Sequence, residues 1–258
     1  HSCSSCGICI DQCQMSFSAG INNMQSVYLM KAIRNNYETN DIAFNCLLCG
    51  RCDISCPVGI ELSPVRMIQR REGNPEKKKV TLLTLYFPEP GKNHKPKTAG
   101  SPSYNYLPAI DQDKTDVLYF AGCMTHLTPS IKKAMTSILD ATGLKWSFMD
   151  ENAGVCCGRP LMLAGQDKEA RELINYNSQI IWKSGASVLV TSCPICYKVF
   201  RESYYLDVEV MHHSQFISSI IEEELVRMKF LHKRVTYHTP CELGRNSGVY
   251  DEPKEVLR

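Results

Sequence analysis

The chain has 258 residues and a formal net charge of +2, with 22% charged and 43% hydrophobic residues. This composition is typical of a folded globular protein, and the near-neutral charge gives no electrostatic reason to expect a nucleic acid or an anionic membrane as partner. The longest apolar run, residues 80–87, contains two threonines and is far shorter than the ~20 residues that a membrane-spanning helix needs. We therefore expect no membrane span.

Fourteen cysteines are the most unusual feature of the composition. A disulfide framework is one interpretation of an even number of cysteines, but a chain of this length does not need disulfides to fold. The spacings are instead those of metal ligands, and free thiols persist in reducing compartments. We expect a cytoplasmic protein whose contact with any membrane is made through a partner.

The N-terminal cysteines form the same motif, C-x2-C-x2-C-x3-C, twice. This spacing is that of bacterial ferredoxins, in which the fourth cysteine of each run binds the other cluster. It predicts two cubane [4Fe–4S] clusters, with zinc sites as a disfavoured alternative because zinc ribbons use separated C-x2-C pairs. We assign the first cluster to Cys3, Cys6, Cys9 and Cys56, and the second to Cys46, Cys49, Cys52 and Cys13. Gly7 and Gly50 lie inside the loops, where the backbone must pass close to a cluster.

The first domain, which we place at 1–75, is expected to be mostly helical. Apolar residues recur at helical spacing between the two motifs, at Ile21, Met24, Val27, Tyr28 and Ile33. Ser63 and Pro64 predict the N-cap and first position of a helix that continues over 65–71. The proline-rich interval 76–115 follows as a linker.

Strand-like and helix-like segments alternate from residue 116 onward. This pattern predicts a largely parallel sheet covered by helices, so that the whole chain is an α+α/β protein with a helical two-cluster ferredoxin-type domain followed by an α/β domain. The expected strands are 117–121, 146–149, 187–190, 208–211 and 235–237. The expected helices are 129–141, 167–183 and 214–228.

Five cysteines follow the predicted carboxyl ends of three strands, where open α/β sheets bind ligands. They are Cys123, Cys156, Cys157, Cys193 and Cys196. A zinc ion with four thiolates and one spare cysteine is one interpretation, and a redox-active dithiol in the Cys-Pro-Ile-Cys segment is another. An iron–sulfur cluster is favoured because adjacent cysteines can both bind a cluster that has several irons.

The segments Gly122-Cys123, Cys156-Cys157-Gly158 and Cys193-Pro194-Ile195-Cys196 resemble the CCG domain of the B and D subunits of heterodisulfide reductase. Similar segments occur in the iron–sulfur subunits of glycolate oxidase, anaerobic glycerol-3-phosphate dehydrogenase and the lactate-utilisation complex. The resemblance covers nearly the whole chain. It implies a noncubane [4Fe–4S] cluster held by these five cysteines.

A second CCG domain begins near the end of the sequence and is incomplete within these 258 residues. The segment Tyr237-His-Thr-Pro-Cys241 is similar to its opening, with Glu242 where histidine is common, and no second Cys-Cys-Gly follows. We place the first CCG domain at 116–234 and the start of the second at 235–258, with Cys241 as a possible ligand. In the family, disulfide reduction needs both halves, which leaves catalysis by this chain alone in doubt.

Other polar residues near the motifs are ambiguous. Structural or surface roles are favoured over metal ligation for four histidines: His126, His212, His213 and His238. Arg159 and Arg245 flank cluster motifs, where they would stabilise a reduced cluster, meet an anionic substrate or form ordinary salt bridges.

Three functional hypotheses follow, and none assigns a catalytic residue. The first is an oxidoreductase subunit of heterodisulfide reductase type. The second is a relay subunit that passes electrons from a hydroxyacid or glycerol-3-phosphate dehydrogenase toward quinone. The third is a binding scaffold with structural zinc. Because no G-x-G-x-x-G fingerprint is present, electrons must enter or leave through a partner, either a flavoprotein or a membrane oxidoreductase subunit.

Overall fold

The structure is a computed structural model that describes residues 3–4, 6–17, 40–73, 115–151 and 155–258. The helical spacing expected between the two N-terminal motifs and nearly all of the expected linker lie outside these residues. The chain divides into two compact units, one of 1–78 with 161–167 and one of 79–160 with 168–258. No helix in the described parts is long and apolar enough to cross a membrane.

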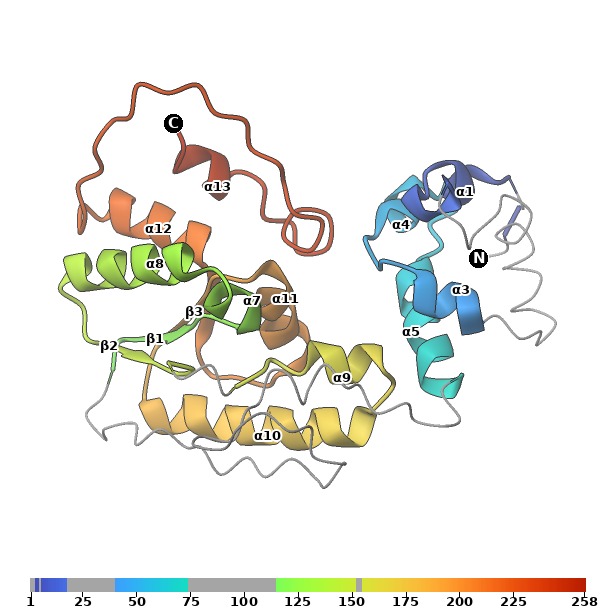
Figure 1. The fold of residues 1–258 in the computed structure, drawn as a ribbon, viewed down its shortest axis with the longest axis horizontal. Coiled ribbons are helices and arrows are strands. Elements are labelled where there is room, and N and C mark those ends of the chain that lie inside the picture. Colours follow the sequence, from blue (N-terminus) through green and yellow to red (C-terminus); the bar gives the residue numbers. More distant parts are fainter. Residues whose placement is uncertain (1–2, 5, 18–39, 74–114, 152–154) are drawn as a thin grey trace. The chain divides into compact units, whose positions relative to one another are not determined.

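The N-terminal unit is helical in its described residues, as expected (Figure 1). Short helices surround the cysteine motifs, and the longest element follows the second motif. The elements are α1 (Ile8–Asp11), the 3-10 helix η1 (Gln14–Phe17), α3 (Asn40–Asn45), α4 (Arg51–Ser55) and α5 (Leu62–Glu72).

The N-terminus of α5 is capped by Asp53, and the prediction that Ser63 is the N-cap was wrong. The helix begins at Leu62, so Ser63 and Pro64 are already inside its first turn. One Asp53 carboxylate oxygen accepts the backbone N–H groups of Leu62 and Ser63 at 2.6 and 3.1 Å, and the other accepts the Ser63 hydroxyl. A carboxylate nine residues earlier therefore satisfies the free amides of the helix, and local sequence spacing does not reveal it.

Gly7 and Gly50 occupy equivalent places before α1 and α4, and both adopt left-handed backbone conformations, with φ of 84° and 68°. A Cβ atom added to Gly7 would meet no protein atom within 4 Å. Glycine is therefore favoured at this turn because of its left-handed backbone conformation. The motif had suggested a different reason, namely a lack of space for a Cβ atom beside a cluster.

The C-terminal unit contains a fully parallel four-stranded sheet with strand order β2-β1-β3-β4. In register, Val117 of β1 lies opposite Trp146 of β2 and Val188 of β3, and Val188 lies opposite Glu209 of β4. The strands are β1 (Val117–Phe120), β2 (Trp146–Phe148), β3 (Val188–Thr191) and β4 (Glu209–His212). The expected parallel sheet is confirmed.

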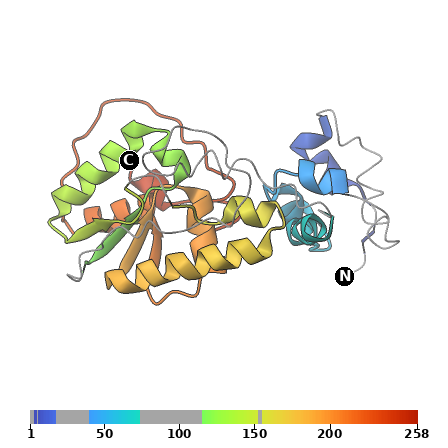
Figure 2. The ribbon, with the colours of Figure 1, turned by 60° about the horizontal axis from the view of Figure 1, so that its bottom comes forward.

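Helices cover both faces of this sheet, which explains why β1 is buried along its whole length (Figures 1 and 2). Tyr119 packs with Leu139 of α8 (Pro129–Thr142) and Phe216 of α12 (His213–Glu222) on one face. On the other face, Phe120 meets Phe200 of α11 (Pro194–Ser203) edge to face, with ring centroids 5.0 Å apart. The remaining helices are α7 (Cys123–His126), α9 (Arg159–Leu163), α10 (Asp167–Ser184) and α13 (Glu252–Glu255).

Two predicted elements near the C-terminus differ from the structure. The helix expected over 214–228 ends at Glu222, because Glu224 adopts a left-handed φ of 58° and the Leu225 amide donates back to the Ile220 carbonyl. This is a Schellman ending, which usually requires glycine, so no residue in this segment signals it. The strand expected over 235–237 is absent: this segment has no strand partner among the described residues, and Val235 is 61% exposed.

We expect Leu139→Ala to lower the free energy of unfolding of the C-terminal unit by about 2–5 kcal/mol. Leu139 is fully buried, and its truncation leaves a cavity between α8 and the sheet. Urea unfolding followed by circular dichroism measures the loss. Ile131→Ala on the same helix is the control, since Ile131 is 44% exposed and its truncation should change stability by no more than ~0.5 kcal/mol. Equal losses in both variants would contradict this packing.

Candidate metal centres

The first set of thiols combines three cysteines of the first motif with the last cysteine of the second. Burial raises the pKa of Cys9, and the neighbouring thiols of Cys3, Cys6 and Cys56 raise it further. The structure therefore brings Cys56 to the first motif, as the crossed assignment expects. Four mutually repelling thiolates need a cationic centre between them to be stable together.

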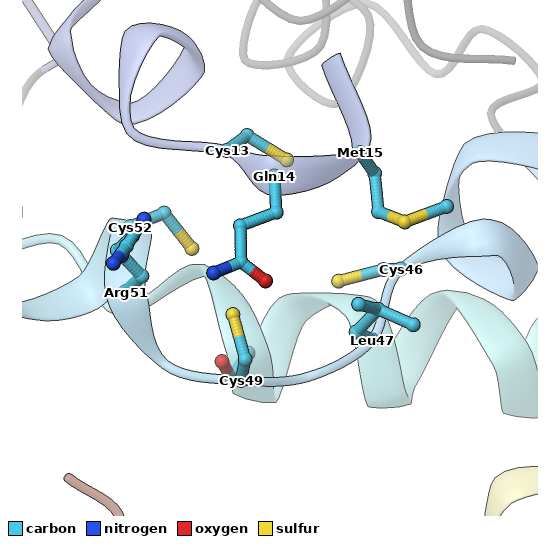
Figure 3. Close-up of a pocket in the computed structure, with 9 residues that line it drawn as sticks. Cys13, Gln14, Met15, Cys46, Leu47, Cys49, Arg51 and Cys52 are labelled. Carbon is cyan, nitrogen blue, oxygen red and sulfur yellow. The ribbon is translucent and has the colours of Figure 1, made fainter. Parts of the chain in front are cut away.

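The second set surrounds a separate cavity in the same unit (Figure 3). Cys46, Cys49 and Cys52 line it from the second motif, and Cys13 lines it from the first. The side chain of Gln14 points into the space among the four sulfurs, as Figure 3 shows. Gln14 is exposed, so it can turn outward to leave this space to a cluster.

Arg70 of α5 fixes the backbone that leads into the second motif. Its guanidinium donates to the carbonyl oxygens of Ala43, Phe44 and Cys46 at 2.8, 3.3 and 2.6 Å. Arg70 is buried, and these carbonyls replace the water that its charge loses. Arg70 could not be recognised from the sequence because its partners are backbone atoms some 24 to 27 residues away.

The five cysteines of the C-terminal unit lie at the topological switch point of the sheet, where successive strands are added first on one side of β1 and then on the other. β1 is followed along the chain by β2 on one side, while β3 and β4 lie on its other side. Such a switch point opens a crevice at the carboxyl ends of the strands. Cys123 begins α7 directly after β1, and Cys193 and Cys196 flank the start of α11 after β3. Cys156 and Cys157 lie in the loop between β2 and α9.

The thiols of these five cysteines interact with one another. The Cys157 thiol hydrogen-bonds with those of Cys156 and Cys196, and these bonds lower the pKa of Cys157 while raising the pKa of both partners. A hydrogen bond from Cys196 lowers the pKa of Cys193. Burial, followed by the charges of Cys157 and Cys193, raises the pKa of Cys123. Only a few of these five thiols can be deprotonated at the same time unless a metal centre supplies positive charge.

Gly122 leaves room for this group of thiols. A Cβ atom at Gly122 would lie 3.1 Å from the Cys196 sulfur and 3.5 Å from the Cys193 Cβ, and its φ is 81°. Both the crowding and the backbone conformation therefore favour glycine. The donor set, its burial and this space together fit an iron–sulfur cluster.

Asp150 holds the loop that carries Cys123. One of its carboxylate oxygens accepts the Ala121 amide and the other accepts the Gly122 amide, both at 2.8 Å. His126 pairs with the same carboxylate, with 3.1 Å between its Nε2 and the Asp150 Oδ2. The structural role expected for His126 is thus supported. Asp150 was missed, although an aspartate just after a predicted strand was a usable signal.

Asn177 and Tyr204 hold the Cys156-Cys157 pair through its backbone. The Asn177 amide donates to the Cys156 carbonyl and to the Tyr204 hydroxyl, both at 2.8 Å, and that hydroxyl donates to the Cys157 carbonyl at 3.0 Å. Asn177 is fully buried among apolar residues of α10. A polar residue in an otherwise apolar helical stripe could have identified it.

Arg159 and Glu242 connect the Cys-Cys-Gly loop to the start of the second repeat. The Arg159 Nη2 and Glu242 Oε1 atoms are 3.4 Å apart, and both side chains are mostly buried. The Glu242 Oε2 atom also accepts a hydrogen bond from the side-chain amide of Asn246 at 2.7 Å. The charge of Arg159 also lowers the pKa of Cys157. The arginine therefore forms the salt bridge and also lies close to the thiols. Cys241 is half-buried and directly precedes Glu242 in the chain.

Of the other three histidines singled out in the sequence, one is buried, one is half-buried and one is exposed. Burial lowers the pKa of His212 to about 3 and that of His213 to about 4, so both are neutral. His212 caps α12, with its Nδ1 accepting the Ser214 amide at 3.3 Å. His238 is exposed.

Within the described residues, no three His, Cys, Asp or Glu side chains converge as the ligands of one metal ion do. The ligands of a cluster bind different iron atoms, so their sulfurs lie on a wider shell than the ligands of a single ion.

Two protein families match this chain. Residues 1–60 match a 4Fe-4S dicluster domain, and residues 117–201 match a cysteine-rich domain named CCG. These ranges contain both ferredoxin motifs and all five cysteines at the switch point. No solved structure matches the chain.

Several curated proteins are similar to it. The D subunit of the dihydromethanophenazine:CoB–CoM heterodisulfide reductase of Methanosarcina mazei is 31% identical over 237 residues, which are 85% of this chain and 57% of that protein. The B subunit of the fumarate reductase (CoM/CoB) of Methanothermobacter marburgensis is 25% identical over 222 residues, covering 82% and 43%. The EtfAB:quinone oxidoreductase of Syntrophomonas wolfei is 27% identical over 161 residues, covering 60% and 22%.

The chain spans little more than half the length of the heterodisulfide reductase subunits that it matches. The similarity to these subunits nevertheless extends over 85 to 100% of this chain and so includes both cysteine-bearing units. The chain therefore joins a 4Fe-4S dicluster domain to a cysteine-rich CCG domain and is a relative of the CCG-domain iron–sulfur oxidoreductase subunits.

Proposed function

We propose that this chain is an iron–sulfur electron-transfer subunit of a multi-subunit oxidoreductase of heterodisulfide reductase type. The observation that carries the proposal is the mutual influence of five thiols at the switch point of the sheet, four of them buried and one half-buried, in a chain that also carries two ferredoxin motifs. A relay needs several redox centres in one chain, and the cysteine sets provide for three.

We assign one cubane cluster to Cys3, Cys6, Cys9 and Cys56, and another to Cys13, Cys46, Cys49 and Cys52. The noncubane cluster is assigned to Cys123, Cys156, Cys157, Cys193 and Cys196. When bound, these clusters supply one-electron transfer, with potentials that the surrounding charge, hydrogen bonds and solvent exposure adjust. The distinction between cubane and noncubane rests on the number of thiols, since a cubane uses four and the switch point offers five.

The residues around the switch point hold the thiols and exclude water from them. Asp150 fixes the Gly122 bend, and Asn177 with Tyr204 fixes the backbone of the Cys156-Cys157 pair. Cys196 is only 3% exposed, whereas Cys123 is half-buried and is the most accessible thiol of the set. A sulfur-containing substrate would therefore approach on the Cys123 side.

A relay subunit that passes electrons toward quinone is the second candidate function, and the similarity to the EtfAB:quinone oxidoreductase favours it. A flavoprotein would be the partner in that case, whereas a membrane oxidoreductase subunit would suit a reductase of heterodisulfide type. A zinc-bound scaffold is the third candidate. We propose the cytoplasm as the location because of the many free thiols, and cell fractionation would test it.

We also propose the domain limits 1–75, 76–115, 116–234 and 235–258, with the last as the start of a second CCG domain. The Arg159–Glu242 pair supports the idea that this second part packs on the first. Cys241 would then be a ligand of a second site that other residues must complete.

Anaerobically purified protein should contain about twelve irons per chain, four for each of the three clusters. Iron, sulfide and zinc analysis measures this directly. About eight irons with stoichiometric zinc would instead support the scaffold with zinc in the C-terminal unit, and about four irons would contradict the two-cluster assignment.

The Cys13→Ser variant should damage the cluster bound by Cys46, Cys49 and Cys52, because Cys13 lines their cavity. EPR of the reduced variant, compared with the unaltered chain, identifies the affected cluster. Cys56→Ser is the reciprocal control and should damage the other cluster. Damage by Cys13→Ser to the cluster of its own motif alone would refute the crossing.

Single serine variants at the five switch-point cysteines should all change the spectrum of the third cluster, because a noncubane cluster uses every thiol. Each variant is prepared in the full chain, checked for folding by circular dichroism, and compared by EPR and visible absorption. Cys241→Ser is the matched control and should have no effect on this spectrum. If one of the five variants keeps an unaltered cluster, the site is a cubane with one idle cysteine, and a site that shows no cluster spectrum in the unaltered chain holds no iron–sulfur cluster.

A further inference from the structure

Two arginines lie on the buried side of α5, which is an unusual place for permanent positive charge. Leu62, Arg66 and Arg70 follow one another at intervals of four residues and so share one face of the helix. Arg66 is 7% exposed and Arg70 is 5% exposed. A guanidinium stays charged in proteins, so its burial must be compensated by partners.

The partners of the two arginines differ. Arg70 donates hydrogen bonds to backbone carbonyls, so its role is to hold the backbone in place. Arg66 donates to the side-chain oxygen of Gln69 at 3.3 Å, and the thiols of Cys46, Cys52 and Cys13 act on its charge. Three of the four thiols around the second cavity therefore act on the Arg66 charge. The same helix contacts the second motif on either side of Arg66, because Ser63 lines the cavity and Arg70 donates to the Cys46 carbonyl at 2.6 Å.

Other charges face the same cavity. Asp53 lies against the Cys52 sulfur at 3.4 Å, but the amides at the start of α5 and the Ser63 hydroxyl already bind its carboxylate. Arg51 also lines the cavity and is half-exposed, so water screens its charge. Arg66 does not line the cavity itself but is more deeply buried than Arg51.

We infer that Arg66 is a positioning residue that raises the reduction potential of the cluster assigned to Cys13, Cys46, Cys49 and Cys52. The inference rests on that proposed ligand set. A cluster bound by four thiolates is negatively charged, and reduction adds one further negative charge. A buried guanidinium whose charge interacts with the ligand thiols stabilises the reduced form more than the oxidised form.

The guanidinium is well suited to this role. It remains protonated at all physiological pH values, so its influence does not vary with pH. The second cluster is therefore a better electron acceptor with the Arg66 charge beside it than without that charge.

The test is a potentiometric titration of the full chain, followed by EPR, for Arg66→Gln, Arg66→Lys and the unaltered chain. The signal that Cys13→Ser removes identifies the second cluster. In Arg66→Gln we expect the equilibrium constant for its reduction to fall about tenfold, a shift of ~59 mV to more negative potential for one electron. Arg66→Lys should cause a smaller fall, because the ammonium keeps the charge but is more strongly hydrated and lacks the forked donor.

Arg71→Gln is the matched control, since it removes the same charge from the same helix at an exposed position and should leave the potential unchanged. Iron content confirms that each variant retains its clusters. If an Arg66 variant keeps the second cluster and its reduction potential is unchanged, the inference is overturned. Loss of the second cluster from both Arg66→Gln and Arg66→Lys would also overturn it. If the unaltered chain shows no second cluster, the proposed function has failed and not only the role of Arg66.

Discussion

Electrostatic repulsion among closely spaced thiolates is the constraint on which both units depend. Each cysteine set brings together sulfurs that carry like charge when they bind metal. Burial raises the pKa of Cys9 and Cys123, and neighbouring thiols raise it further, while a hydrogen bond with Cys157 is the main cause that raises the pKa of Cys156. A metal centre removes this repulsion. The protein also places positive side chains near the thiols, because the charge of Arg66 interacts with Cys46 and the charge of Arg159 with Cys157.

The two units solve the problem of gathering thiols in different ways. In the N-terminal unit, short helices and left-handed glycine turns repeat the same local spacing, and the chain crosses over so that each motif completes the set of the other. In the C-terminal unit, the cysteines are more than 30 residues apart in places, and a parallel sheet brings them to one edge. Buried hydrogen bonds from Asp150 and Asn177 then fix the loops.

Those features that repeat or alternate could be predicted from the sequence. Motif spacing indicated the crossed cysteine sets, and strand–helix alternation indicated the parallel sheet. Helix ends were predicted wrongly where the residue that forms the end or the cap is not of the usual type or not at the usual position. Glu224 ends α12 in a conformation that glycine normally adopts, and Asp53 caps a helix from outside its flanking sequence. Arg70 could not be recognised, because its partners are backbone carbonyls far along the chain, whereas Asn177 was missed although a polar residue in an apolar helical stripe was a usable signal.

The central claim is that the five thiols at the switch point of the sheet hold one noncubane iron–sulfur cluster. Anomalous diffraction from crystals of the anaerobic protein, recorded at the iron and zinc absorption edges, tests it most directly. The account predicts iron density in contact with Cys123, Cys156, Cys157, Cys193 and Cys196, with every sulfur engaged. A single zinc peak, or a regular cubane that leaves one of these cysteines free, would contradict it.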